Sequence, residues 1–149
     1  MARRGRTQRG TTLLEVLTGT ALTAILLAVA VPNFRALATP YEASSAARLM
    51  ASDCAAARMR AIARNQRHRI RVDADAETWV IEAEQAPGSW TAVGETRSAP
   101  GGVTLGAAAP ADPMFNTRGM LAGTVTMTVS HGDSTRTVTI NVLGQATIG

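Results

Sequence analysis

The sequence predicts an α+β fold, in which a long N-terminal α-helix packs on an antiparallel β-sheet domain. Leu13 to Val31 form an apolar run whose only charged residue is Glu15. An alanine-rich segment from about Tyr41 to Asn65 then carries apolar residues at steps of three and four, the spacing of a helix with one buried stripe. From His68 onward apolar and polar residues alternate, as in strands with one buried face. A long helix beside such strands is an α+β arrangement.

The apolar run is long enough to cross a membrane, because a helix of this length spans about 28 Å. The basic residues before it are Arg3, Arg4, Arg6 and Arg9, and the next one is Arg35. This asymmetry predicts a cytoplasmic N-terminus. Four of the 15 basic residues lie in this tail, so 11 remain against 11 acidic residues, and the net charge of +4 belongs to the tail.

The residues alone leave two interpretations of the apolar run open. Ala28-Val29-Ala30 could end a cleaved secretory signal, although the run exceeds the usual signal core and contains a carboxylate. The run could instead be an uncleaved signal anchor with Glu15 near the membrane interface. Neither interpretation explains why Gly10 stands directly before the run and an acid stands within it.

A third interpretation comes from a resemblance. Gly10-Thr11-Thr12-Leu13-Leu14-Glu15, the apolar run and Val31-Pro32-Asn33-Phe34 together resemble the N-terminus of type IV pilins and pseudopilins. The resemblance implies that a prepilin peptidase cuts after Gly10 on the cytoplasmic side and that the new N-terminus, Thr11, is methylated. Glu15 would then be the fifth residue of the mature chain. The chain departs from the family in having Thr11 where phenylalanine is typical. We favour this interpretation.

A role for Glu15 follows from its surroundings. A lone carboxylate in lipid must be protonated or find a cation, because burying an unpaired charge is costly. The freed α-amino group of Thr11 in a neighbouring subunit would be such a cation. Pairing the two would set the axial offset between helices packed in a filament, and a buried pair of this kind is better evidence for register than for stability.

The alanine-rich segment predicts a stalk helix with one apolar stripe. The stripe consists of Ala43, Ala46, Ala47, Met50, Cys54, Ala57 and Ala61. On this stripe Cys54 is expected to be a small buried hydrophobe, and no disulfide can form because it is the one cysteine. Pro32 is expected to break or kink the helix, and Pro40 to mark a first turn or a bend.

A basic run crosses from this helix into the first strand. It consists of Arg58, Arg60, Arg64, Arg67, Arg69 and Arg71, and the acids Asp73, Asp75, Glu77, Glu82, Glu84 and Glu95 follow it. The run could be a patch for phosphate or for an acidic partner. It could instead be a solvated helix end that the acids of the next hairpin balance, and we favour this second interpretation.

The remaining sequence predicts strands joined by turns. One hairpin has Ile70 and Val72 opposite the strand around Trp79 and Ile81, with short strands expected near Trp90–Val93 and Val103–Leu105. Residues 107–113 are predicted to be loop. The last hairpin pairs two strands with apolar residues on one face, which are Val125, Met127, Val129, Val138, Ile140 and Val142, around a turn at His131-Gly132-Asp133.

The C-terminal half strengthens the resemblance. Phe115-Asn116-Thr117-Arg118-Gly119, then Val138-Thr139-Ile140-Asn141 and Gly144 resemble the minor pseudopilin domain of the GspH/FimT family. The resemblance implies a pilin-like fold with a leader peptide at 1–10, a transmembrane and assembly helix at 11–34, an amphipathic stalk helix at 35–67 and a periplasmic β-rich domain at 68–149.

Two functions are compatible with this resemblance. One is a minor pseudopilin of a type II protein secretion system, held in the bacterial inner membrane with its domain in the periplasm and assembling with other pseudopilins. The other is a minor type IV pilin for pilus assembly or DNA uptake. DNA-binding members carry a basic motif near the final glycine, whereas residues 144–149 lack arginine and Arg136 is the one basic side chain after Arg118. Binding to phosphates needs clustered cations. The sequence therefore disfavours DNA binding and favours the pseudopilin.

The sequence predicts no catalytic, cofactor-binding or metal-binding residue. The two histidines, His68 and His131, stand in polar, turn-like or strand-edge contexts without a cysteine or acid at metal-ligand spacing. The partners implied by the resemblance are a prepilin peptidase, other pseudopilins or pilins, and inner-membrane lipid. We therefore expect a protein that is not an enzyme.

Overall fold

In the computed structural model of the chain, residues 12–149 are described, with the backbone alone for residues 31–38. The predicted cleavage site at Gly10 and Thr11 lies outside the described residues. The chain forms two compact units, Met1–Leu37 and Ala38–Gly149. Each unit is considered by itself below.

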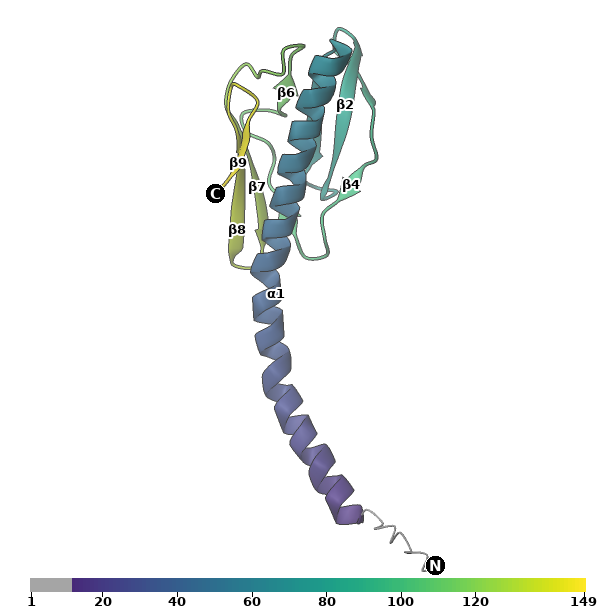
Figure 1. The fold of residues 1–149 in the computed structure, drawn as a ribbon, viewed down its shortest axis with the longest axis vertical. Helices are drawn as coiled ribbons and strands as arrows, with labels where there is room; N and C mark the ends of the chain where they lie inside the picture. The colour runs from purple at the N-terminus through teal and green to yellow at the C-terminus, as the bar shows by residue number, and fades with distance from the viewer. Residues whose placement is uncertain (1–11) are drawn as a thin grey trace, which may run out of the picture. The chain divides into compact units, whose positions relative to one another are not determined.

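One helix, α1, spans Leu13–Arg64 and belongs to both units (Figure 1). The helix continues through Pro32 and Pro40, so the break expected at Pro32 and the first turn expected at Pro40 are both wrong. A proline removes one backbone donor, and the neighbouring turns keep their own hydrogen bonds.

The end of α1 has a physical cause in the backbone of the next two residues. Asn65 adopts a left-handed φ of 49° and its N–H donates to the Ile62 carbonyl at 3.3 Å. The N–H of Gln66 donates to the Ala61 carbonyl at 3.2 Å. These two bonds form a Schellman motif, which satisfies carbonyls that the helix end would otherwise leave unpaired.

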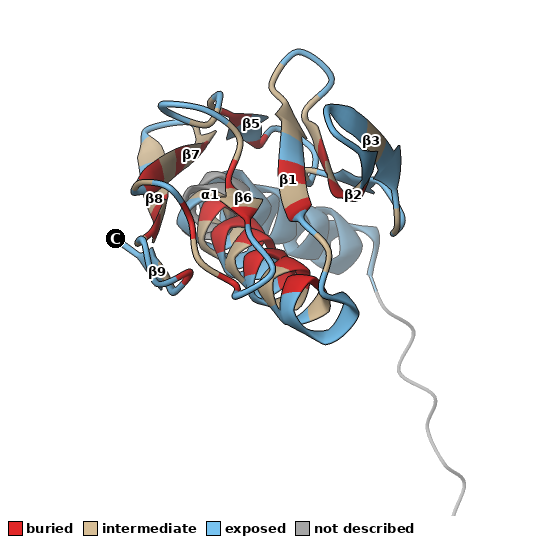
Figure 2. Cartoon of the chain, turned by 90° about the horizontal axis from the view of Figure 1, so that it is seen from above, coloured by how far each residue is buried: buried red, intermediate tan, exposed pale blue. Residues whose placement is uncertain are grey.

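The strands divide between two antiparallel sheets. The first has the order β3-β2-β1-β6, with β4 paired to β2, and contains β1 His68–Asp73, β2 Thr78–Ala86, β3 Ser89–Ala92, β4 Arg97–Ser98 and β6 Met114–Phe115. The second has the order β5-β7-β8-β9 and contains β5 Thr104–Leu105, β7 Val125–His131, β8 Ser134–Ile140 and β9 Ala146–Ile148. The two sheets arch over one face of the helix segment that begins at Ala38 (Figure 2).

Both predicted hairpins are confirmed. β1 and β2 pair in a register that places Ile70 opposite Ile81, and β7 and β8 place Met127 opposite Val138. The predicted loop at residues 107–113 is present, apart from one isolated bridge between Ala109 and Thr126. In the last hairpin Val125, Met127, Val129, Val138 and Ile140 pack inward, because successive side chains of a strand point to opposite faces. The expectation that Val142 would join them is wrong, since β8 ends at Ile140 and Val142 is exposed.

The core lies between the second half of α1 and the two sheets. The predicted alanine stripe is confirmed: Ala43, Ala46, Ala47, Met50, Cys54, Ala57 and Ala61 are all buried. Small side chains on the helix leave room for large ones from the sheets, which are chiefly Trp79, Phe115, Ile70, Met127 and Ile140. Burying each large apolar side chain contributes about 1.5–3 kcal/mol.

Candidate functional site

Glu15 lies in the first turn of α1, and its side chain is exposed. Its backbone N–H donates to the Thr12 carbonyl at 3.0 Å and to Thr12 Oγ1 at 3.3 Å. Thr12 is therefore the N-cap, and Glu15 stands three residues later, where the acid of a capping box belongs. A carboxylate at this position also interacts favourably with the helix dipole. Among residues 12–149 the Glu15 carboxylate has no ion-pair partner, so it remains available for one.

The first part of α1, on both sides of Glu15, exposes apolar side chains along its length. Leu13–Ala30 is long and apolar enough to cross a membrane, and none of it is buried within the protein. The exposed large side chains are Leu13, Leu14, Val16, Leu17, Leu22, Ile25, Leu26, Leu27 and Val29. A helix that is apolar on all sides is suited to lipid or to packing against other helices.

The threonines within this apolar segment bond to the helix itself. Thr18 Oγ1 donates to the Leu14 carbonyl at 2.9 Å, and Thr23 Oγ1 donates to the Gly19 carbonyl at 2.8 Å. Thr20 Oγ1 likewise donates to a carbonyl of the preceding turn. Their hydroxyls therefore need no water, which lowers the cost of placing them in a bilayer.

A buried polar contact attaches the second half of α1 to the first sheet. The Trp79 indole Nε1–H donates to Asp53 Oδ2 at 2.8 Å, and Arg97 Nε lies 2.7 Å from the same oxygen. Sequence reasoning missed Asp53, which stands beside Cys54 near the apolar stripe. The available signal was Trp79 itself, because a buried indole usually needs an acceptor.

Cys54 is fully buried, as the sequence predicted. Burial, and secondarily the negative charge of Asp53, raises the pKa of its thiol to about 12. Since the thiolate is the nucleophile and the metal ligand, this cysteine is inert at neutral pH.

Two glycines of the C-terminal motifs meet Arg58 of α1. Gly119 has a φ of 73° and Gly144 a φ of 76°, both in the left-handed region. A Cβ on Gly144 would lie 2.2 Å from the Gly119 carbonyl oxygen, and one on Gly119 would lie 2.7 Å from Ile62 Cδ1. The Arg58 Nε–H donates to that same Gly119 carbonyl at 3.2 Å. These glycines therefore allow two loops to approach the helix.

Three arginines of the basic run, Arg67, Arg69 and Arg71, lie close to glutamates of β2. Arg67 pairs with Glu84 at 3.0 Å, and Arg69 pairs with Glu82 at 2.7 Å. Arg71 lies 3.9 Å from Glu82. The interpretation that acids of the next hairpin balance the run is therefore confirmed for these three arginines. Arg69 also stacks on the Trp90 ring, with its Cζ 4.5 Å from the ring centroid.

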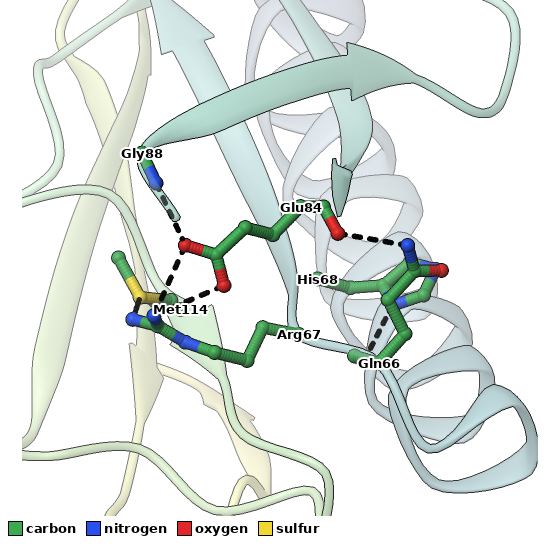
Figure 3. A network of polar contacts seen from close by, with 6 residues as sticks. All are labelled: Gln66, Arg67, His68, Glu84, Gly88 and Met114. Atoms are coloured by element: carbon green, nitrogen blue, oxygen red, sulfur yellow. Dashed lines mark hydrogen bonds and ion pairs between the residues drawn. The ribbon is translucent and has the colours of Figure 1, made fainter. Parts of the chain in front are cut away.

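Glu84 is the centre of a polar network at the end of the helix (Figure 3). Its carboxylate accepts hydrogen bonds from Arg67 and from the Gly88 backbone N–H at 3.1 Å. Its carbonyl accepts one from Gln66 Nε2 at 2.8 Å. Arg67 also contacts the Met114 sulfur. The network joins the helix end, the β2–β3 turn and β6.

One of the two histidines is placed differently from expectation, since His131 ends β7 beside the turn as expected but His68 does not lie at an edge. His68 is fully buried rather than at a strand edge, because β1 has a neighbour on each side and this position faces inward. Its Nδ1 lies 2.9 Å from the Gln66 carbonyl, whereas its Nε2 has no hydrogen-bond partner in the described part of the chain. His131 Nδ1 lies 2.9 Å from Glu42 Oε2. Within residues 12–149 no group of three or more histidine, cysteine or acidic side chains could hold a metal ion.

Known proteins share this fold. The minor pseudopilin EpsH from the type 2 secretion system of Vibrio cholerae matches with a TM-score of 0.59 at 17% identity, over 72% of this chain and 96% of that one. The type IV minor pilin FimU of Pseudomonas aeruginosa matches with a TM-score of 0.61 at 19% identity, over 73% of this chain and 89% of that one. Identities this low show the fold alone. No curated protein matches the chain.

The family itself is shown by the sequence. The family model of the type II transport protein GspH matches residues 46–144, which is more than half of the chain. The chain therefore belongs to the GspH family of type II transport proteins, which are structural pseudopilins and not enzymes.

Proposed function

We propose that the chain is a minor pseudopilin held in the bacterial inner membrane by Leu13–Ala30, with its domain in the periplasm. The observation that carries this proposal is an exposed, mainly apolar helix segment, with Glu15 as its one charged residue, on a chain whose domain has its own closed core. Membership of the family implies assembly with other pseudopilins. The filament would drive export of folded proteins across the outer membrane.

In this proposal the leader comprises residues 1–10 and the mature chain begins at a methylated Thr11. Residues 11–34 form the membrane and assembly segment, residues 35–67 the stalk and residues 68–149 the periplasmic domain. Glu15 pairs with the Thr11 amine of a neighbouring subunit. Its exposed side chain without an ion-pair partner among residues 12–149 supports this role.

The second candidate is a minor type IV pilin. The similarity to FimU supports it only at the level of the fold. The basic run argues against a DNA-uptake role. Arg67 and Arg69 are already paired with glutamates, so they offer less net positive charge to phosphates.

Processing gives the direct test. When the chain is coexpressed with a prepilin peptidase, mass spectrometry should find a product that begins at N-methylated Thr11. Gly10→Ala should remain a full-length precursor, because the added Cβ hinders close approach of the peptidase to the backbone at the cut. Gly19→Ala is the matched control, since it removes a glycine from the exposed helix where a Cβ meets no atom within 4 Å. It should be trimmed like the wild type. Normal trimming of Gly10→Ala, or a product cut after Ala30, would contradict the leader assignment.

Export gives the functional test. A strain that lacks this chain should lose secretion of the proteins that its type II system exports, and the wild-type chain should restore it. Unimpaired secretion together with lost pili would favour the pilus instead.

A further inference from the structure

An apolar pocket of about 330 Å³ lies beside the edge strand β6. Two segments flank it, one from Pro110 to Asn116 and one from Met120 to Val125. Its apolar lining is formed by Pro110, Ala111, Met114, Met120, Leu121 and Val125. Neither the membrane anchor nor the core requires an open cavity here.

Hydrogen bonds hold both flanking segments, so the pocket is preformed. The Asn116 N–H donates to the Met120 carbonyl at 2.9 Å, and the Met120 N–H donates to Asn116 Oδ1 at 3.0 Å. On the other side Ala109 and Thr126 exchange two backbone hydrogen bonds of 2.9 Å. A ligand that binds a preformed pocket loses little free energy to the ordering of the surrounding loops.

Two charged side chains line the pocket, and only one is neutralised. Arg67 forms its ion pair with Glu84. Asp112 accepts a hydrogen bond from the Val72 N–H at 3.3 Å, but it has no ion-pair partner in the described residues. The pocket is therefore apolar inside and carries one unneutralised negative charge.

We propose that this pocket receives a bulky apolar side chain from another pilin-like subunit, with a basic residue next to it in that subunit. The size suits one aromatic or leucine side chain, and such anchors in pockets dominate protein interfaces. Met114 and Met120 can adapt to the shape of the anchor. The adjacent basic residue complements Asp112. The identity of the partner rests on the proposed function; the chemistry of the pocket does not.

The methionines allow a direct binding test on the full chain in lipid nanodiscs. With all six methionine methyl groups labelled, Met114 and Met120 report on the pocket, Met50 and Met127 on the core, and Met59 on the exposed helix. The probes are N-acetyl-Phe-Arg-amide and N-acetyl-Phe-Glu-amide. We expect saturable shifts at Met114 and Met120 with the arginine peptide and none at Met50 or Met127.

Two variants test the parts of the site separately. Asp112→Asn should abolish the preference for the arginine peptide over the glutamate peptide, which we expect to be about two- to fivefold from one exposed ion pair. Ala122→Trp places an indole at the exposed rim and should block both peptides. Ala92→Trp is the control, at an exposed position on β3 away from the pocket. Unchanged Met50 and Met127 signals establish that each variant is folded.

Crosslinking then tests the partner. A photoreactive residue at position 122 should form an adduct in cells that mass spectrometry identifies as a pilin-like subunit, and the same residue at position 92 should not. Equal shifts at Met59, no preference for the arginine peptide, or equally tight binding of toluene would overturn the pocket assignment. An adduct with a protein of another class would overturn the partner. The peptide result is independent of Glu15, so its failure leaves the proposed function standing.

Discussion

The indole of Trp79 donates its hydrogen bond to a carboxylate, Asp53, that is itself inside the interface between the helix and the first sheet. Arg97, which is about half exposed, holds the same oxygen from the solvent side. The contact therefore fixes how the stalk half of α1 lies on β2, and its loss leaves a buried donor without an acceptor.

Asp53→Ala should destabilise the domain by roughly 2–3 kcal/mol, because the Trp79 N–H then remains buried and unpaired. Asp53→Asn keeps an acceptor and should cost about 1 kcal/mol. Urea unfolding followed by tryptophan fluorescence measures both. Equal stability of Asp53→Ala and the wild type would show that water replaces the carboxylate.

The raised pKa of Cys54 predicts that the folded chain loses stability at alkaline pH. Its pKa is raised from 9.0 to about 12 in the folded chain, mainly by burial. Below pH 9 the thiol is neutral in both states and has no effect. As the pH rises from 9 toward 12, the unfolded chain ionises first, so the free energy of unfolding should fall. Cys54→Ala should lack this alkaline dependence, although it also loses packing. Iodoacetamide should label Cys54 only in denaturant, and rapid labelling of the native chain at pH 8 would refute its burial.

Gly144→Ala should be strongly destabilising, by more than ~2 kcal/mol. The added Cβ would meet the Gly119 carbonyl oxygen at 2.2 Å, and the left-handed backbone adds its own cost. Gly123→Ala is the control, because its Cβ would meet nothing within 4 Å. Thermal unfolding of the two variants compares them. Similar midpoints would show that the loop can move away from Gly119.

The Glu15 variants separate pairing from capping. Glu15→Ala should insert in the membrane more easily, by roughly 2–3 kcal/mol near the bilayer centre and less near an end, but it should assemble poorly. Glu15→Gln keeps a residue suited to a capping box while it loses the charge, so its assembly should be intermediate. Crosslinking to other pseudopilins in membranes measures assembly.

Thr12→Ala provides the control for these variants. It removes the cap at the start of α1 and keeps the Glu15 charge, so crosslinking should persist. If Thr12→Ala assembles as poorly as Glu15→Ala, then capping accounts for the effect. If Glu15→Ala assembles and secretes like the wild type, Glu15 is not an assembly contact and the plain signal anchor becomes the better interpretation.

The chain should bind duplex DNA no better than ~10⁻⁴ M at physiological salt, the weak end of non-specific binding. The reason is that Arg67, Arg69 and Arg71 face acids of the neighbouring strand. Fluorescence anisotropy at several salt concentrations measures the affinity. A tighter and steeply salt-dependent affinity would favour the DNA-uptake pilin, and the surface from Arg58 to Arg71 would be the place for mutations.

The sequence by itself determined the features that depend on near neighbours along the chain. The apolar run and the stripe from Ala43 to Ala61 follow from helical spacing, and the β7–β8 hairpin follows from alternation around a glycine turn. Each of these signals is a period or a turn residue within one segment, so it can be recognised without knowledge of the rest of the chain.

Only the tertiary structure decided the contacts between distant segments. Trp79 donates a hydrogen bond to Asp53, 26 positions away in the chain, and Arg58 donates one to the carbonyl of Gly119, 61 positions away. Local propensity also gave no basis for dividing the strands between two sheets or for the continuation of α1 through Pro32. These outcomes depend on which surfaces meet when the helix packs on the strands. A buried donor needs an acceptor, and here the acceptor comes from a distant segment that local sequence does not identify.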